Sequence, residues 1–212
     1  MKRISLLITV LLALSPLFSY AQPGPADFDL GLKLGATFAK LDGETWQNGY
    51  KAGFHGGIFG GVKVKKIGVQ VEAYFSQQRY TTNGVRFYNS FYQPENVFKN
   101  PADSAKEASF SVGYLNIPVL FQLKLFGNAW LQAGPQYSGL ISIKDNDDVL
   151  KDASDLLKTG DLSGVVGVWL NLPAGLNAGA RYIFGLSDLN VNSAGDTWKQ
   201  RTIQLHIGYN FL

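Results

Sequence analysis

The chain contains 212 residues, with 19 Lys and Arg, 16 Asp and Glu, and no cysteine. This length fits one domain or a small pair, and the absence of cysteine excludes a disulfide framework. Setting aside Lys2 and Arg3, which precede the folded part, leaves 17 basic groups against 16 acidic ones. The basic isoelectric point therefore gives no reason to expect a nucleic-acid partner.

The first residues have the pattern of a secretory signal peptide. A basic start is followed by a short apolar stretch at 4–18, and Ser19-Tyr20-Ala21 is a small-x-small cleavage pattern. The apolar stretch is too short and too interrupted for a membrane-spanning helix. We expect 1–21 to be the signal peptide and 22–212 a single β-barrel domain.

The mature part alternates apolar and polar residues, which is the period of a β-strand. Eight such runs cover 28–41, 50–64, 67–80, 113–126, 129–142, 162–172, 176–186 and 202–212. Glycine and aromatic residues are abundant, as is typical of an exported all-β protein.

The connections between these runs alternate in length. Three are tight turns, at Lys65-Lys66, Gly127-Asn128 and Pro173-Ala174-Gly175. Four are longer, at 42–49, 81–109, 143–161 and 187–201. Short turns at one end and long loops at the other, with an even strand number, are typical of outer-membrane barrels. The predicted fold class is all-β: an eight-stranded antiparallel up-and-down transmembrane β-barrel with short periplasmic turns and long extracellular loops.

Alternation alone does not say which face points outward, because a soluble barrel of the lipocalin kind alternates with its apolar face inside. The polar face of these runs is dominated by glycine, glutamine and asparagine, with only scattered charges. A water-facing surface is richer in charge, at roughly 25–35%. The composition therefore favours a membrane barrel with a crowded polar lumen.

The fourth run contains a proline, which the middle of a sheet normally excludes. Counting from the Gly127-Asn128 turn places Pro118 beside Gln136 and next to Pro135 of the fifth run. We expect a β-bulge or a splayed ladder there, close to the loop-side end of the barrel.

Several segments together resemble the PorT family of outer-membrane barrels, within the broader outer membrane protein beta-barrel domain group. They are "LGLKLGATFAKL", "GFHGGIFGGVKV", "YLNIPVLFQLK", "WLQAGPQYSGLIS", "DLSGVVGVWLNLPAGLNAGARYIFGLSDL" and "IQLHIGYNFL". The resemblance spans nearly the whole mature chain. It implies an eight-stranded barrel in a Gram-negative outer membrane, and it says little about activity. The name-giving member is similar to a component of protein secretion, and no residue set here carries that role over.

The chain ends on alternating aromatic residues. Tyr209 and Phe211 lie on the outward phase, which is similar to the C-terminal signal that the barrel-insertion machinery reads. Leu212 occupies the place where that signal usually has phenylalanine. The other reading is an ordinary apolar last strand.

Ionisable residues on the inward phase are candidates for function because they are costly to bury unless paired or hydrated. They are Lys33, His55, Glu72, Lys124, Arg181 and His206. We expect Glu72 to pair with Lys33, Lys63 or Arg181 and so to plug the narrow lumen. An ion path and a hydrolase site are the alternatives. Ser76 falls near His55, but no acid is placed to orient that histidine.

The longest loop carries five aromatic residues, namely Phe87, Tyr88, Phe91, Tyr92 and Phe98. They are candidates for binding a glycan or a partner protein. They are equally suited to form a lid packed on the rim of the barrel.

The segment 144–161 has apolar residues at helical spacing, and we expect a short amphipathic helix on the outer rim. Asp145, Asp147 and Asp148 lack the glycine and the distant glutamate of a calcium loop. We expect them to cap the N-terminus of that helix instead.

These patterns predict a structural or interaction role for the barrel, with binding through its extracellular loops, and no enzymatic activity. A narrow pore for small solutes is the alternative, and a lipid-modifying hydrolase is a weaker one. The expected partners are outer-membrane lipid, the barrel-insertion machinery, and a protein or glycan at the loops. We expect no cofactor, no metal and no nucleic acid.

Overall fold

The computed structural model describes residues 26–89, 98–100, 102, 106–152, 156–191 and 196–211. The predicted signal peptide lies outside these residues.

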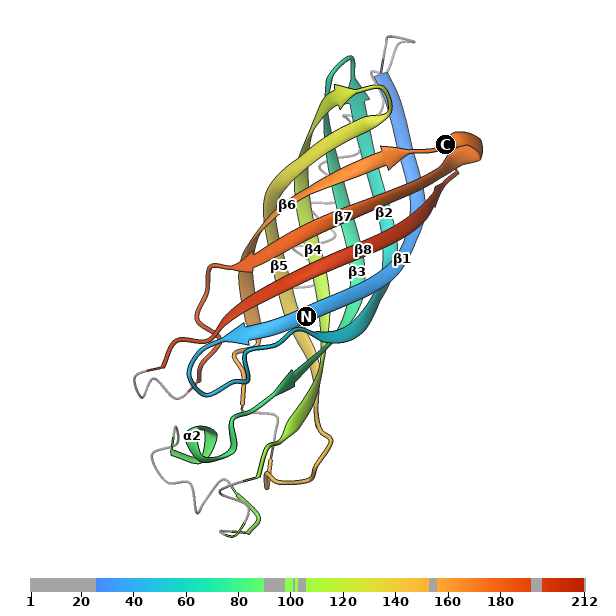
Figure 1. Cartoon of the computed structure of the whole chain (residues 1–212). Helices are drawn as coiled ribbons and strands as arrows, with labels where there is room; N and C mark the ends of the chain where they lie inside the picture. Colours follow the sequence, from blue (N-terminus) through green and yellow to red (C-terminus); the bar gives the residue numbers. More distant parts are fainter. Residues whose placement is uncertain are drawn as a thin grey trace, which may run out of the picture.

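Eight antiparallel strands close into a single barrel, in which each strand pairs with its neighbours in the sequence and β8 pairs with β1 (Figure 1). The strands are β1 (Ala26–Asp42), β2 (Lys51–Val64), β3 (Ile67–Thr81), β4 (Ser109–Phe126), β5 (Ala129–Asp145), β6 (Gly160–Asn171), β7 (Leu176–Gly185) and β8 (Lys199–Asn210). The predicted strand number, order and closure are confirmed.

The two ends of the barrel differ as the connection lengths predict. At one end lie the three tight turns, the start of β1 and the end of β8 (Figure 1). Lys65 and Gly127 take positive φ angles of 56° and 49° in two of these turns, which lets two residues reverse the chain. At the other end lie the long loops and the one-and-a-half-turn helix α2 (Gly84–Asn89). Among the described residues, no helix has the length and apolar character that crossing a membrane requires.

Three strands extend beyond the others at the loop end. β4 begins at Ser109 and β5 ends at Asp145, so both are longer than the sequence pattern indicated. The last register pair between β2 and β3 is Phe54 with Gln77, whereas β3 and β4 stay paired up to Thr81 with Ser109. The sheet of β3, β4 and β5 therefore stands out past the rim.

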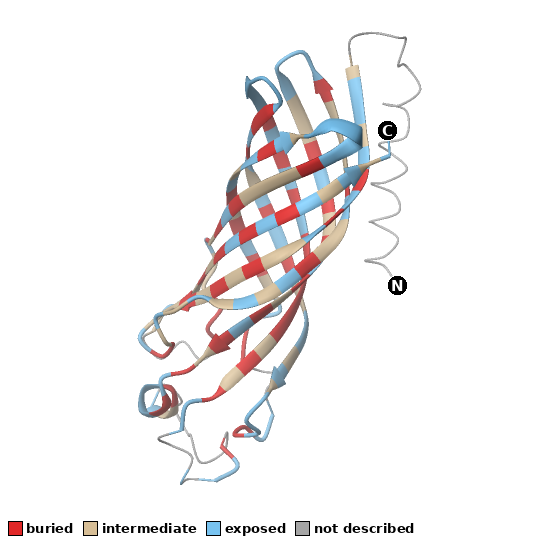
Figure 2. Cartoon of the chain, turned by 45° about the vertical axis from the view of Figure 1, so that its right-hand side comes forward, coloured by how far each residue is buried: buried red, intermediate tan, exposed pale blue. Residues whose placement is uncertain are grey.

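The alternation of faces agrees with the predicted phase. Large apolar side chains such as Leu34 and Ile207 are exposed on the outward face. Along most of each strand the alternate residues, whose side chains point into the lumen, are buried or half-buried, as the alternating colours of Figure 2 show. In β6 the two apolar phases compete in the sequence. Val166 is exposed there, and Trp169 is buried in the lumen. Aliphatic and aromatic side chains thus cover the outside of the barrel.

The two prolines interrupt the hydrogen-bond ladders without shifting their register. Pro118 pairs with Gln136 as expected. The pairing of β3 with β4 skips from Val119 to Asn116, and that of β4 with β5 skips from Pro118 to Phe121, so of the two expected irregularities the structure has the splayed ladder and not the β-bulge. The register shifts of β4 lie elsewhere, at Gly113/Tyr114 and Lys124/Phe126. The expected position near the rim is wrong, because β2 leaves β3 at Gln77, which pairs with Gly113, five residues beyond Pro118.

Inward glycines make room for the large side chains that fill the lumen. A Cβ on Gly31 would lie 2.5 Å from the ring of Phe59, and one on Gly167 would lie 2.6 Å from Cγ of Arg181. These distances are too short for any side chain. The glycine-rich polar face predicted from the sequence is therefore needed for packing in a barrel this narrow.

Candidate functional site

A buried ion cluster crosses the middle of the lumen. Arg181 on β7 donates two hydrogen bonds to Glu72 on β3, from Nη1 to Oε2 at 2.7 Å and from Nη2 to Oε1 at 2.6 Å. Lys33 on β1 reaches the same carboxylate, with Nζ 2.5 Å from Oε2. The three side chains come from three strands, and all are almost completely buried. Glu72 thus joins strands that lie across the lumen from one another.

Amides complete the hydrogen bonds of this cluster. Gln70 donates to Oε1 of Glu72 at 2.6 Å, and Gln132 accepts from Arg181 at 2.7 and 3.1 Å. The Nζ atom of Lys33 also lies 4.3 Å from the centre of the Tyr74 ring. Buried charges are tolerated when they are paired and hydrogen-bonded in this way. Lys33, Arg181 and Gln70 together donate four hydrogen bonds to the two carboxylate oxygens of Glu72.

The two histidines lie beside the ion cluster but form no catalytic arrangement. Nδ1 of His55 lies 2.9 Å from Oγ1 of Thr37, and Ser76 accepts a hydrogen bond from Asn116 at 2.9 Å. Both ring nitrogens of His206 and Nε2 of His55 make no hydrogen bond to any described residue. The predicted register of His55 opposite Ser76 is found, without a carboxylate bonded to His55 in the part of the chain that the structure describes.

The prediction that Lys124 belongs to the polar cluster of the lumen is wrong. Its side chain is exposed at the short-turn end, with Nζ 5.8 Å from the centre of the Trp130 ring. The inward phase was right, but the position along the strand takes the side chain to the mouth of the barrel. Lys63, a suggested partner of Glu72, pairs instead with Asp29 at 2.5 Å, also near this mouth.

An apolar cap fills the lumen at the loop end. Trp46 lies at its centre, with ring centroids 5.1 Å from Trp198, 5.9 Å from Tyr80 and Phe87, and 6.1 Å from Phe110. The buried members of this cap are Ala39, Leu41, Trp46, Tyr80, Phe87, Phe98, Ala108, Phe110, Val112, Tyr114, Val149, Leu150, Leu156, Leu157, Leu189 and Trp198. The cap joins every long loop to the ends of the strands.

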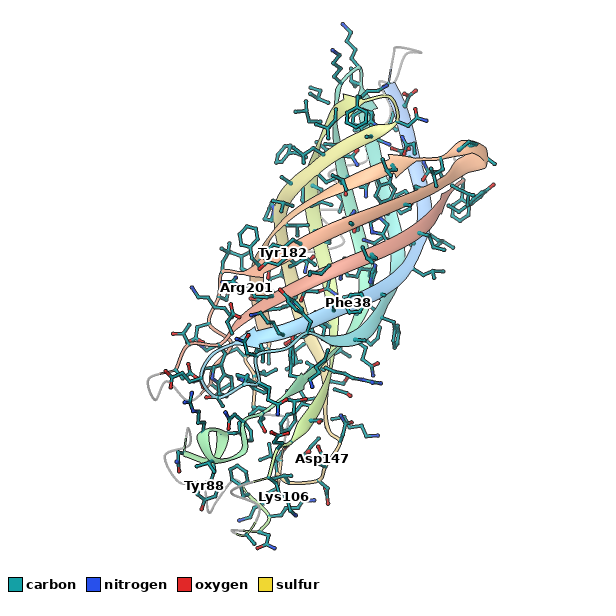
Figure 3. All side chains as sticks on the ribbon, viewed as in Figure 1. Phe38, Tyr88, Lys106, Asp147, Tyr182 and Arg201 are labelled. Atoms are coloured by element: carbon teal, nitrogen blue, oxygen red, sulfur yellow. The ribbon has the colours of Figure 1, made fainter. Side chains whose placement is uncertain are left out.

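Of the five candidate aromatic residues, Phe87 and Phe98 are cap residues and are buried. This contradicts their role as an exposed binding surface and agrees with the lid reading. Tyr88 is half-buried and lies in α2, packed against Phe98 at 4.9 Å between ring centroids (Figure 3). Phe91 and Tyr92 lie outside the described residues.

The predicted amphipathic helix on the rim is wrong for the described residues of 144–161. Leu150 and Leu157 each form an isolated β-bridge, to Phe98 and Asn190, and they are buried in the cap. The spacing that suggested a helix thus reflects anchoring of the loop. Asp145 accepts hydrogen bonds from the backbone of Val149 and Leu150, so it holds a turn rather than a helix N-terminus.

Sequence reasoning missed the cap because its residues come from different loops. One signal was present in β4: Phe110, Val112 and Tyr114 are apolar on the inward phase, which carries the polar side chains of Asn116 and Gln122 farther along the strand. A change from polar to apolar on the lumen face indicates a second core at the end of the barrel.

A network around one carboxylate tethers two of the loops. Asp196 accepts hydrogen bonds from the backbone N–H and hydroxyl of Thr45, at 3.0 and 2.6 Å, and from Nε1 of Trp198 at 3.2 Å. Burial opposes ionisation, but these donors outweigh it and hold the pKa of Asp196 below its usual value. The described residues contain no group of three acidic, histidine or cysteine side chains that could hold a metal ion.

Comparison with known proteins assigns the chain to a protein family. Residues 20–191 match the model of the outer membrane protein beta-barrel domain. The Neisserial surface protein A (NspA) superposes with a TM-score of 0.50 at 13% identity, over 89% of this chain and 100% of that one. This likeness supports the fold alone. No curated protein matches the sequence.

Two further barrels superpose less well. Ail of Yersinia pestis, in complex with the heparin analogue sucrose octasulfate, has a TM-score of 0.48 at 13% identity, covering 87% of this chain and 99% of that one. OprG of Pseudomonas aeruginosa has a TM-score of 0.44 at 14% identity, covering 89% and 98%.

Proposed function

Because the chain belongs to the outer membrane protein beta-barrel domain family, we propose that it is a non-conducting barrel of a Gram-negative outer membrane that presents its cap to a protein or glycan at the cell surface. In such barrels the short turns face the periplasm and the long loops face outward. The cap is then the part of the molecule that meets the surroundings of the cell.

The filled lumen is the observation that carries this proposal. Side chains occupy it at three levels. The ring cluster of Phe59, Trp130 and Trp169 lies toward the short-turn end, the Glu72 cluster lies in the middle, and the apolar cap lies at the loop end. An eight-stranded barrel is just wide enough for its own side chains. Filling at every level argues against a path for solutes.

The outer side of α2 is the candidate contact surface. Phe87 points into the cap, whereas Val85 and Arg86 are exposed and Tyr88 is half-buried. A short helix held by one buried aromatic residue presents the other side chains in a fixed arrangement. Such a mixed apolar, basic and aromatic surface suits a protein or glycan partner.

A direct test uses the triple variant Val85→Ser, Arg86→Ser and Tyr88→Ser in the full-length barrel. Capture of envelope proteins and glycans by the wild type should be lost in this variant and kept in Lys65→Ser, Lys66→Ser, which changes the opposite end. Equal capture by all three proteins would contradict binding through α2.

The second candidate is a narrow pore, and it is favoured by Nε2 of His55 and both ring nitrogens of His206, which make no hydrogen bond to a described residue. Buried polar atoms without protein partners usually bind water, which would hydrate the lumen beside the ion cluster. Conductance across a planar bilayer separates the two functions. We expect silence from the purified wild type, whereas stable single-channel steps that disappear on heat unfolding would support the pore.

Membership of the PorT family is a finer proposal, supported by the resemblance of the β4, β5 and β8 segments. Recognition by the insertion machinery is a related one. Tyr209 and Phe211 are exposed with ring centroids 5.7 Å apart, which suits an aromatic signal on the last strand. Slower insertion of Phe211→Ala than of Phe28→Ala by the purified machinery would support it, and equal rates would not.

A hydrolase remains the weakest proposal. His55 and Ser76 are on neighbouring strands, but each bonds to another residue, Thr37 and Asn116 respectively. General-base activation of a serine needs a histidine that bonds to the hydroxyl and is itself oriented. We therefore propose that the barrel does not act on lipid as an enzyme.

A further inference from the structure

A polar hollow opens on the outside of the barrel where β2 leaves β3. Pairing of these strands stops at Phe54 with Gln77, while β3 continues to Thr81. The resulting space has a volume of about 450 Å³ and lies between the start of β2 and the protruding sheet of β3, β4 and β5. Its lining includes Lys51, Arg79, Thr81, Ser109, Ser111 and Asn146.

The register places two cations in one row on the outward face of this sheet. Arg79 pairs with Ser111, and Ser111 pairs with Lys144, so the three side chains share a face. Inward neighbours confirm the phase, because Gln78 and Phe110 are buried. Lys51 adds a third cation from the other side of the hollow.

The row lies just beyond the apolar surface. Phe75 and Leu115 pair in register and are the last large apolar residues on the outward face of β3 and β4. Gln77 and Gly113 form the next row, and Arg79 lies two residues farther along the strand. A long, flexible guanidinium in this position reaches the level at which lipid headgroups meet the acyl chains.

These cations have no carboxylate partner. Among the described residues, neither Arg79, Lys51 nor Lys144 forms an ion pair or a side-chain hydrogen bond. On the other side of the rim, by contrast, Lys40 and Arg201 share the carboxylate of Asp42, at 2.8 and 2.9 Å. Figure 3 shows Arg201 on that side, close to Tyr182.

The carboxylates nearest in sequence are already occupied. Asp147 accepts a hydrogen bond from the backbone N–H of Ser109 at 2.6 Å, and Asp145 accepts from the turn that follows it. Figure 3 shows Asp147 on the loop after β5. Nδ2 of Asn146 donates a hydrogen bond to Oγ of Ser111 at 3.1 Å, and the second N–H of this amide is a neutral donor at the edge of the hollow.

We propose that this hollow binds the phosphate group of an outer-leaflet lipid. Arg79 would bind two phosphate oxygens with its forked guanidinium, and Lys144 and Lys51 would add point charges. The acyl chains would run down the apolar face below Phe75 and Leu115. This inference needs the outer-membrane location only, and it holds whether or not the cap binds a partner.

The test uses the full-length barrel in phosphatidylcholine nanodiscs that contain either diphosphoryl lipid A or the same lipid with both phosphates removed. Native mass spectrometry measures how much glycolipid stays with the protein. We expect the wild type to retain the diphosphoryl form, and Arg79→Gln, Lys144→Gln to retain about tenfold less, because charge-assisted hydrogen bonds are lost.

The matched control is Lys65→Gln, Lys66→Gln, which removes two charges at the periplasmic end. It should retain the diphosphoryl lipid as the wild type does. Equal loss in both variants would show general electrostatic attraction and overturn the site. Equal retention of the two glycolipids by the wild type would also overturn it, as would displacement of the lipid by inorganic phosphate at low concentration, which would indicate a site for the free ion. Both variants change exposed side chains, and circular dichroism checks that the barrel is folded.

Discussion

The middle and the loop end of the same lumen are filled by opposite chemistry. In the middle, one carboxylate holds two cations, and amides satisfy the rest. At the loop end, sixteen buried apolar side chains, Trp46 among them, form one cluster. The ion cluster holds strands together through directed bonds and is sensitive to the loss of a single partner. The cap gathers loops by apolar burial, which is less directional and spread over many contacts.

The largest expected effect comes from breaking the ion cluster at its anion. Glu72→Ala leaves Lys33 and Arg181 buried without a counter-charge, and removing one partner of a buried pair costs about 3–5 kcal/mol. We expect a loss near the upper end, because two cations are stranded. Urea unfolding of the barrel in lipid vesicles measures it.

The matched control is Glu44→Ala. This carboxylate is exposed in the cap region, where its side chain is 85% exposed and 3.5 Å from Arg86. Surface pairs of this kind contribute about 0–1 kcal/mol. A similar loss in both variants would mean that burial and pairing in the lumen do not distinguish Glu72.

A substitution in the cap should affect the stability of the whole barrel less than Glu72→Ala does, and its effect should be confined to the loops. Phe87→Ala removes a buried ring that packs on Trp46, Phe98 and Phe110, and such truncations cost about 3 kcal/mol or more. We expect cleavage of the long loops by an external protease to rise while the barrel itself stays folded. If urea unfolding of the whole barrel shifts as much as for Glu72→Ala, the cap and the ion cluster form one cooperative unit instead of two.

A smaller effect concerns the polar tether of the cap. The pKa of Asp196 is lowered in the folded state, so its carboxylate form stabilises the cap above the unfolded pKa of about 4, and this contribution is lost as the pH falls through the folded pKa. Protease resistance of the loops should therefore decrease below about pH 4. In Asp196→Asn this pH dependence should be weaker. The free energy of opening the cap at neutral pH should fall by roughly 1 kcal/mol, and the loops should be cleaved faster. An unchanged pH profile in Asp196→Asn would assign the acid sensitivity to another group.

The sequence predicted the barrel well because period, turn length and composition are local properties. Strand number and closure order follow from them. The inward phase left Lys33, Lys63 and Arg181 as candidate partners of Glu72, and the structure pairs Glu72 with Lys33 and Arg181. The cap was not predictable in the same way, since Trp46, Leu150 and Trp198 come from three loops whose folding depends on long-range packing. Pro118 shows a further limit, because phase and pairing place it correctly while the length of β4 does not follow from the pattern.

The smallest expected effect compares two lysines on the inward face of the barrel, Lys124 at its mouth and Lys33 in the middle of the lumen. Lys124 has the same inward phase as Gln122 and was predicted to share the lumen cluster, yet it is exposed at the periplasmic mouth. Lys124→Gln should therefore change the free energy of unfolding by less than about 0.5 kcal/mol, as for other exposed substitutions. Lys33→Gln on the same phase should cost several times more, because it removes a buried partner of Glu72. Comparable losses of unfolding free energy in the two variants would mean that Lys124 also interacts with the charges of the lumen. The expected contrast would show that depth along the strand, which a two-residue period does not encode, decides whether an inward charge supports the fold or only faces water.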